Sequence, residues 1–477
     1  MKRLNLFFTL AILFIFAACS KKSNEKLQEV AGNYFSGQSD IIGFGKISIG
    51  QIRDQSKIEN VPFFGEIVKK ELSNVQSGID IADYVYFGIQ AKNETDFSVT
   101  AFAKVENADS LNKYLKERGN TVSKDNNLYV TEEDEMILVF DENLVALRAG
   151  KNNDKAGFIK TFKALKSGTI SNENIAKALD KDAPFVVALM ADKYQQLNPN
   201  EEYKQLMNAD LYKDVIQCMD IKFNKGNIEL TSEFIADKAK LKKLDFVNNS
   251  GEAKSLRISG TDIFYFVLNA DFSKVEKENK KLFDYLMGKL DEELAEYKEM
   301  DEEELIYKSK QQELLELAKK FISKDHPLTS LSNGVFFLTA EQNKENYKMP
   351  HLNFYLGSSN KEMKEYLSGL IRTWDPSSDI KITNNTIQGT IFKAPKAIKY
   401  SKNADVNGNV LKLFLDVNYV TSILEKEENP AAYYTKPIKS VEAYSKENIA
   451  KLTINMNDAS TNGLETLVKH YTSQGQR

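Results

Sequence analysis

Residues 262–275 read DIFYFVLNADFSKV, an apolar stretch followed by a small polar residue and then by apolar residues at helical spacing. Three other stretches repeat this plan: DIIGFGKISIGQI (40–52), PFVVALMADKYQQL (184–197) and VLKLFLDVNYVTSI (410–423). The polar residues at the change are Ser48, Asp192, Asp271 and Asn418. Such side chains cap helix N-termini by accepting hydrogen bonds from free backbone N–H groups. Each stretch therefore predicts a strand that runs directly into a helix.

The spacing of these four positions indicates an internal duplication. Ser48 and Asp271 are 223 residues apart, and Asp192 and Asn418 are 226 apart. A third match, KGNI (225–228) against KENI (446–449), has nearly the same offset. We therefore expect two tandem domains, at residues 33–250 and 251–477, with a junction near VNNSGEAKS (247–255).

An insertion in the second domain follows from a fourth match with a larger offset. Tyr114-Leu115 aligns with Tyr366-Leu367 at 252 residues, about 29 more than the first pair. Residues 272–322 contain no proline, and Leu282, Leu286, Leu290, Leu294 and Tyr297 recur at helical spacing. We predict a projecting arm made of two antiparallel helices or one bent helix. Its acidic run, 291–304, is interpreted as a solvated helix face, because successive helical carboxylates cannot surround one calcium ion.

The strand patterns predict the fold class. IFYFVL and FVVALM are apolar on both faces, which is typical of central strands, whereas KLTINM alternates and exposes one face. Each domain should be a mostly antiparallel sheet with packed helices. The expected class is α+β, with the helical arm in the second domain.

The N-terminus predicts export and lipid attachment. Met1, Lys2 and Arg3 precede a short apolar core that ends at FAAC (16–19), so residues 1–18 read as a signal peptide. FAAC resembles a lipobox, with Phe where Leu is usual, and we predict acylation of Cys19 rather than a disulfide. Residues 19–32 would be the lipidated cysteine and a flexible tether. Lys21 and Lys22 in place of an acidic cluster favour the periplasmic face of the outer membrane, with the cell surface as the alternative.

Composition excludes several classes of protein. Without Lys2 and Arg3 the chain has 62 basic and 68 acidic residues, a formal net charge of −6. A basic surface that could replace phosphate counterions is not expected, so nucleic acid is excluded as a partner. Cys218 would be the only remaining thiol, and its apolar surroundings (DVIQCMDIKF) predict a small buried side chain rather than a nucleophile.

Motifs for catalysis or cofactor binding are lacking in the sequence. The three histidines, His326, His351 and His470, are far apart, and we interpret the first two as exposed loop residues. GFGKISIG (43–50) lacks the third glycine of a dinucleotide-binding loop, and we interpret it as a strand whose glycines allow close packing. DVNGN (405–409) resembles the start of a calcium loop, but its Asn-Gly favours a hairpin turn. No catalytic residue, metal or other cofactor is assigned.

The lipobox cysteine together with the repeated strand-to-helix stretch resembles a family of Bacteroidota lipoproteins known only by a domain of unknown function. No activity or site residue follows from this resemblance, which favours a non-catalytic protein. We expect an envelope protein that is attached to the membrane by its lipid and binds a protein, glycan or lipid partner. The alternative is a hydrolase whose carboxylates converge in space. Trp374, in TWDPSS, is interpreted as a loop residue packed on its own domain rather than as a sugar contact.

Overall fold

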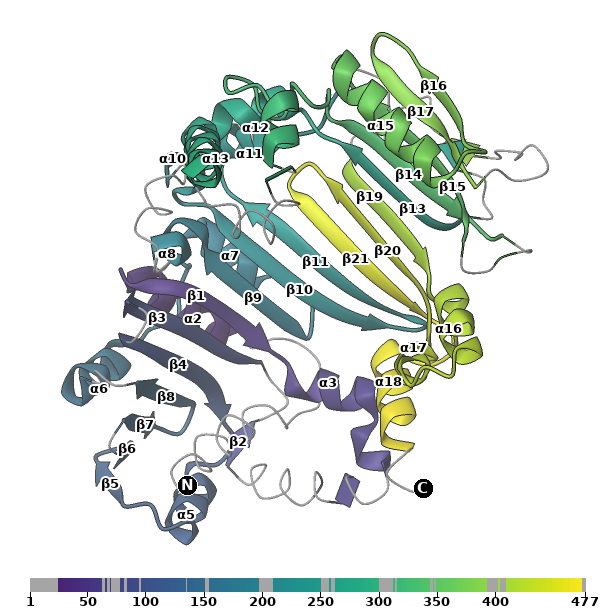
Figure 1. Ribbon diagram of the computed structural model, residues 1–477. Coiled ribbons are helices and arrows are strands. Elements are labelled where there is room, and N and C mark those ends of the chain that lie inside the picture. Colours follow the sequence, from purple (N-terminus) through teal and green to yellow (C-terminus); the bar gives the residue numbers. More distant parts are fainter. Residues whose placement is uncertain are drawn as a thin grey trace. The chain divides into compact units, whose positions relative to one another are not determined.

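The computed structural model describes residues 25–473 apart from 62–64, 67–68, 70–77, 81–83, 94–95, 134, 151–153, 197–208, 250–256, 259–261, 300–311, 314, 344–345, 347–348, 393–401 and 404–408. The chain divides into two units, and Figure 1 labels their helices and strands. Unit 1 contains residues 1–200, 212–237 and 455–477, and unit 2 contains residues 201–211 and 238–454. Both are α+β, with antiparallel strand pairing and packed helices, as predicted.

The sheet of unit 1 is centred on β1 (Ile41–Ile47), which pairs with β3 (Val85–Asn93) on one side and β9 (Phe185–Met190) on the other. Beyond β9 follow β10 (Ile216–Asn224) and β11 (Asn227–Ile235). Beyond β3 the order is β4 (Asp96–Val105), β8 (Leu144–Gly150), β7 (Met136–Phe140), β6 (Leu128–Glu133) and β5 (Val122–Asp125), with β2 (Ile79–Asp80) also against β4. Gly45 of β1 lies between β9 and β3 at a position without room for a side chain, because a Cβ there would lie 2.7 Å from the Phe87 ring of β3.

Unit 2 repeats this pairing order around β13 (Asp262–Asn269), which pairs with β14 (Val335–Glu341) and β19 (Asn409–Asp416). Beyond β14 lie β15 (His351–Gly357), β17 (Thr386–Ile391) and β16 (Asp379–Ile382), and beyond β19 lies β20 (Ile438–Lys446). The remaining strands are β21 (Ile449–Met456) and the short pair β12 (Arg257–Ile258) and β18 (Lys402–Asn403). In both units the strand before the first predicted helix is thus central.

The helices of unit 1 with described bounds are α2 (Glu25–Gly37), α3 (Ile49–Ser56), α5 (Ala108–Glu117), α6 (Lys155–Ala164), α7 (Glu173–Leu179), α8 (Ala191–Gln196) and α18 (Gly463–Thr472), with a 3-10 turn at Ile58–Asn60. Those of unit 2 among the described residues include α11 (Lys238–Leu244), α12 (Phe272–Glu278), α13 (Lys280–Glu299), α15 (Lys361–Trp374), α16 (Val417–Lys426) and α17 (Ala431–Thr435), and residues 315–321 are helical as well. The short α10 (Ala209–Tyr212) ends at the division between the units.

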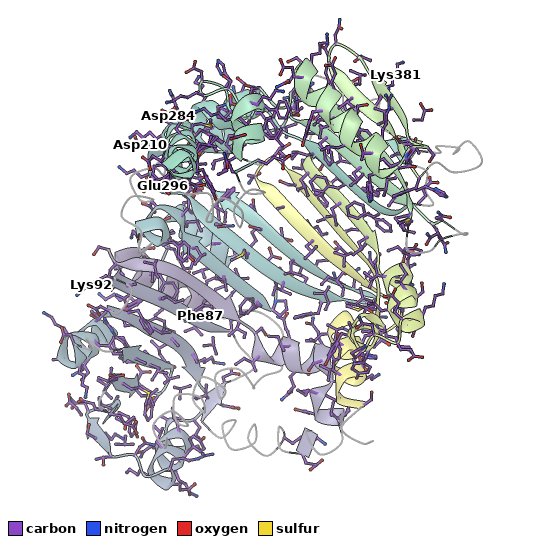
Figure 2. All side chains as sticks on the ribbon, in the orientation of Figure 1. Phe87, Lys92, Asp210, Asp284, Glu296 and Lys381 are labelled. Atoms are coloured by element: carbon purple, nitrogen blue, oxygen red, sulfur yellow. The ribbon has the colours of Figure 1, made fainter. Side chains whose placement is uncertain are left out.

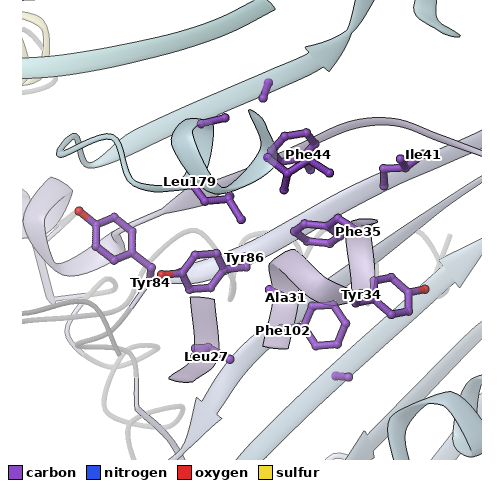
Figure 3. Close-up of a cluster of buried hydrophobic side chains, with 14 of the residues drawn as sticks. Leu27, Ala31, Tyr34, Phe35, Ile41, Phe44, Tyr84, Tyr86, Phe102 and Leu179 are labelled. Carbon is purple, nitrogen blue, oxygen red and sulfur yellow. The ribbon is translucent and has the colours of Figure 1, made fainter. Parts of the chain in front are cut away.

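The largest apolar cluster lies in unit 1, where α2 and α7 cover one face of the sheet. Phe35 of α2 stacks on Phe44 of β1 at 5.8 Å between ring centroids, and Tyr34 meets Phe102 edge-on at 5.0 Å (Figure 3). Leu27 and Ala31 of the same helix are also buried. The predicted tether is therefore wrong from residue 25 onward, because the apolar face of α2 packs into this core.

The predicted helix caps are found at two of the four positions. Ser48 accepts a hydrogen bond from Gln51 N at the start of α3, and Asp271 accepts one from Lys274 N at 3.0 Å at the start of α12. Asn418 is not a cap: Asp416, the last residue of β19, accepts from Tyr419 N at 3.2 Å. This strand ends in the cap itself, so the helix begins at Val417.

Asp192 is likewise the second residue of its helix, because α8 begins at Ala191 directly after β9. A carboxylate in the first turn of a helix is favoured by the helix dipole without capping it. Asp192 and Asn418 are each the second residue of their helix rather than the cap before it. Each follows a strand that pairs with the central strand of its unit, β9 in unit 1 and β19 in unit 2. Asp192 and Asn418 therefore keep equivalent places in the two units.

The predicted arm is helical where it is described. Asp291 of α13 forms ion pairs with Lys319 at 3.0 Å and Lys324 at 3.6 Å, so the two helical stretches lie side by side. Leu294 and Tyr297 of the predicted apolar face are buried, as is Met287, whereas Leu286 of that face is exposed. The junction predicted at residue 250 lies outside the described residues. Residues 238–249 pack in unit 2, where Phe246 O accepts from Asp271 N.

Candidate functional site

Cys19 lies outside the described residues, so its lipidation stays a prediction. No helix in the described part of the chain is long and apolar enough to cross a membrane. Of the DVNGN stretch, only Asn409, which begins β19, lies within the described residues.

Cys218 is a buried thiol in β10, only 1% exposed. Burial raises its pKa to about 12, because the thiolate would be removed from water. A thiol in this environment has almost no nucleophilic form near neutral pH. The structure therefore supports a packing role for Cys218.

A buried acid lies near this thiol. Asp220, two residues further along β10, is 4% exposed, and its Oδ1 accepts no hydrogen bond within the described structure. Burial raises its pKa, although the Lys181 ammonium opposes that shift. Lys181 is held by Glu233 of β11. The Asp220 carboxyl is therefore costly to ionise in its buried site.

The three histidines remain apart in the structure. The side chain of His326 is 72% exposed in a loop, with Nδ1 3.8 Å from Oε2 of the buried Glu276. His470 lies on α18. Contrary to its predicted exposure, His351 is buried, because it enters β15 and its ring bonds the carbonyl of Phe392 at the end of β17. Within the described residues, no three His, Cys, Asp or Glu side chains are grouped so that they could hold a metal ion.

His351 nevertheless belongs to a row that the sequence did not reveal. It pairs across the sheet with Glu341 of β14, which pairs with Asp262 of β13. Directly opposed residues have Cβ atoms about 5 Å apart, so two acids and an imidazole lie in one row. A carbonyl only accepts, so His351 donates through Nδ1 and keeps Nε2 free to take a proton. These three side chains form a candidate set for acid–base chemistry in unit 2.

The row is closed to large substrates. Asp262 and His351 are each 9% exposed, and Oε1 of Glu341 is buried without a hydrogen bond. The next row is also polar and internally satisfied: Thr390 Oγ1 donates to Asn353 Oδ1 at 3.0 Å, and Asn353 Nδ2 donates to Thr339 Oγ1 at 3.3 Å. Cross-strand bonds of this kind hold three strands in register. A glycan or peptide chain cannot reach these groups unless the residues that bury them move away.

The exposed side of α15 presents a different chemistry. Its inner side is buried through Met363, Lys364 and Ser368, and the helix packs on β16 and β17. On the outer side Tyr366 is 36% exposed, Leu370 50% and Trp374 63%. These three residues, called the α15 stripe below, follow at steps of four, each advancing about 40° around the helix axis. They form one apolar line along an accessible edge of the helix.

Trp374 is thus not the packed loop residue that its sequence predicted. It ends α15, and its ring meets Phe392 edge-on at 5.0 Å while most of its surface stays exposed. Tyr366 at the other end lies 5.5 Å from Phe321 of the arm. Both aromatic rings are therefore held in place on one side and open on the other.

The corresponding helix of unit 1 is polar on this side. Both α5 and α15 follow the second strand beyond the central one, and both have an Asn cap, Asn107 and Asn360. Counted from the caps, Lys113 and Glu117 stand where α15 has Tyr366 and Leu370. Lys113 and Glu117 form an exposed ion pair at 3.9 Å. The fold therefore accepts charge at these positions, and the α15 stripe is not needed to form the helix.

This count differs by one residue from the sequence alignment, which paired Tyr114 with Tyr366. Burial supports the alignment counted from the caps. This alignment pairs Leu111 with Lys364 and Leu115 with Ser368, and all four residues are buried. The shared Tyr-Leu dipeptide thus faces different surroundings in the two helices. Only the burial of the neighbouring turns reveals this shift.

Comparison with known proteins does not identify a family. No family model and no curated protein matches the chain. The resemblance to Bacteroidota lipoproteins therefore stays a prediction. Among solved structures, crystal forms III and I of TP0453 are similar at a TM-score of 0.27 and 10% identity. The matches cover 44% and 45% of this chain and 84% and 80% of the other. Similarity at this level carries no argument about function.

Proposed function

We propose that the protein is a non-catalytic binding protein of the bacterial envelope, attached to the membrane through Cys19, and that the α15 stripe is its contact surface. The observation that carries this proposal is the exposure of Tyr366, Leu370 and Trp374, the first two at positions where the matching helix carries an ion pair. Tyr and Trp are enriched among the residues that carry most of the binding energy at interaction sites. Isolated exposed apolar residues would carry no such weight.

The test uses residues 20–477, which retain every described residue and lack the predicted acyl group. This protein should co-sediment with washed envelope membranes. The double variant Tyr366→Lys/Leu370→Glu copies the charges of α5 and should lose most of the binding while keeping its circular dichroism. Tyr434→Ser removes another exposed aromatic ring, on α17, and should bind like the parent protein. Equal binding by all three proteins would contradict the proposal.

The carboxylate hydrolase remains the second candidate because Asp262, Glu341 and His351 share one row. Their burial disfavours it. Assays on peptidoglycan, glycan, lipid and peptide panels decide the matter with Glu341→Gln as the variant. Saturable turnover that this substitution abolishes would replace the binding function by catalysis.

A further inference from the structure

We infer that the α15 stripe binds the surface of a phospholipid bilayer, with Leu370 and Trp374 entering the boundary between headgroups and acyl chains. This inference rests on the proposed function and names its partner. Tyr and Trp have an apolar ring and a polar tip, and they concentrate where an apolar layer meets water. Leu370 stands between them and carries no polar atom in its side chain. The stripe thus has the chemistry of an interfacial helix edge.

The size of the surface favours a bilayer over a folded partner. A helix of 14 residues is about 21 Å long and about 10 Å wide, so its exposed side offers about 200 Å². A stable protein interface buries about 800 Å² on each partner. A second copy of this chain held by the stripe alone would therefore dissociate easily. A bilayer has no such requirement, because it is continuous and deforms around single side chains.

The predicted lipid anchor at Cys19 would keep the whole chain next to a bilayer. The described structure begins at Glu25, six residues after the start of the predicted anchor at Cys19. Six extended residues span at most about 20 Å. An acylated Cys19 therefore holds the beginning of α2 within about 20 Å of the membrane. Phospholipid is then the most concentrated apolar phase around the protein.

The charges of α15 do not oppose this contact. Its two acids are ion-paired: Glu362 with Lys320 at 3.6 Å and Glu365 with Lys361 at 3.8 Å. Arg372 of the same helix is exposed and forms no ion pair with any described residue, and neither does the exposed Lys381 of β16 (Figure 2). Lipid phosphates would therefore meet cations rather than uncompensated carboxylates. Because the stripe itself is uncharged, salt should screen only the contribution of these two cations, and the apolar contact should persist.

The experiment uses Trp374 as the probe, since it is the only tryptophan in the chain. Residues 20–477 are titrated with vesicles of phosphatidylethanolamine and phosphatidylglycerol. We expect Trp374 emission to shift to shorter wavelength, brominated acyl chains to quench it, and binding to persist in about 0.5 M NaCl. Tyr366→Lys/Leu370→Glu keeps the probe and should weaken partitioning about tenfold or more, since burying one large apolar side chain is worth that factor. Tyr434→Ser should partition like the parent protein.

The outcomes separate this inference from the proposed function. Binding to envelope membranes without any response to protein-free vesicles would overturn the lipid partner and leave a protein or glycan partner for the same stripe. Binding to neither would overturn both. Vesicle binding that the double variant retains would place the contact elsewhere and overturn the inference. A concentration-dependent dimer that the double variant abolishes would make a second copy the occupant and overturn it as well.

Discussion

Replacing Lys364 by Met tests how α15 is held against its sheet. Lys364 is 1% exposed, and its ammonium donates to the carbonyl oxygens of Thr383 and Asn384 at 2.7 Å each. These carbonyls lie in the turn between β16 and β17. Methionine retains the apolar stem and removes the charge and both hydrogen bonds. The variant therefore isolates the link between α15 and this turn.

The expected loss of stability follows from one unfavourable contribution and two that partly offset it. Two hydrogen bonds from a charged donor contribute about 3–6 kcal/mol together. Thr383 and Asn384 are exposed, so water can hydrate the freed carbonyls and recover a large part of this energy. Burying a thioether instead of an ammonium also removes a desolvation cost. We expect Lys364→Met to lower the free energy of unfolding of unit 2 by about 1–3 kcal/mol. Lys364→Ala should cost about 2 kcal/mol more, because about three buried methylene groups are lost at about 0.8 kcal/mol each.

Urea unfolding followed by Trp374 fluorescence measures this loss, because the probe sits at the end of the same helix. Lys361→Met is the control: Lys361 is exposed and, among the described residues, pairs only with Glu365 at 3.8 Å, so its removal should change stability by less than about 0.5 kcal/mol. A Lys364→Met protein as stable as the parent would show that the ammonium-to-carbonyl bonds give no net stabilisation. The same result in Lys364→Ala would refute the packing term too.

Three other substitutions have defined outcomes. Asp220→Asn should stabilise the protein at pH 7.5, with the gain shrinking toward pH 4: burial raises the folded-state pKa of Asp220, so its ionisation costs stability as pH rises through that pKa. Thermal unfolding at both pH values checks this, and a constant difference would contradict it. Cys218, with a pKa of about 12, is about 0.01% thiolate at pH 8, so its reaction with Ellman's reagent should be limited by local unfolding. Rapid labelling of the folded protein would disprove burial. Cys19→Ala should leave an uncleaved or non-acylated chain, and mass spectrometry of an acylated product from this variant would exclude Cys19 as the lipid site.

The repeat could be predicted because cap residues and apolar strands are local features. Ser48 and Asp271 each follow a strand and accept the bond from the third residue of the helix, so their spacing of 223 residues reflects matching structural positions. A local pattern could not identify the cap where two nearby residues are both able to cap a helix. Asp416 and Asn418 are both good caps, and pairing of β19 up to Asp416 decides between them. The polar composition of residues 19–32 predicts a tether, but Leu27, Ala31, Tyr34 and Phe35 follow at helical spacing, and their burial in the core shows that this spacing outweighs the composition.

The sequence by itself determined the fold class, the duplicated order of strands and helices, the buried nature of Cys218 and the absence of nucleophile and phosphate motifs, because these depend on residues within a few positions of one another. Only the tertiary structure decided which side chains meet. The row of Asp262, Glu341 and His351 depends on the register of three strands separated by long connections, which no local pattern encodes. The exposure of Leu370 and Trp374 depends on which side of α15 the sheet covers. A sequence shows that a helix has an apolar edge, whereas only packing shows whether that edge is left open.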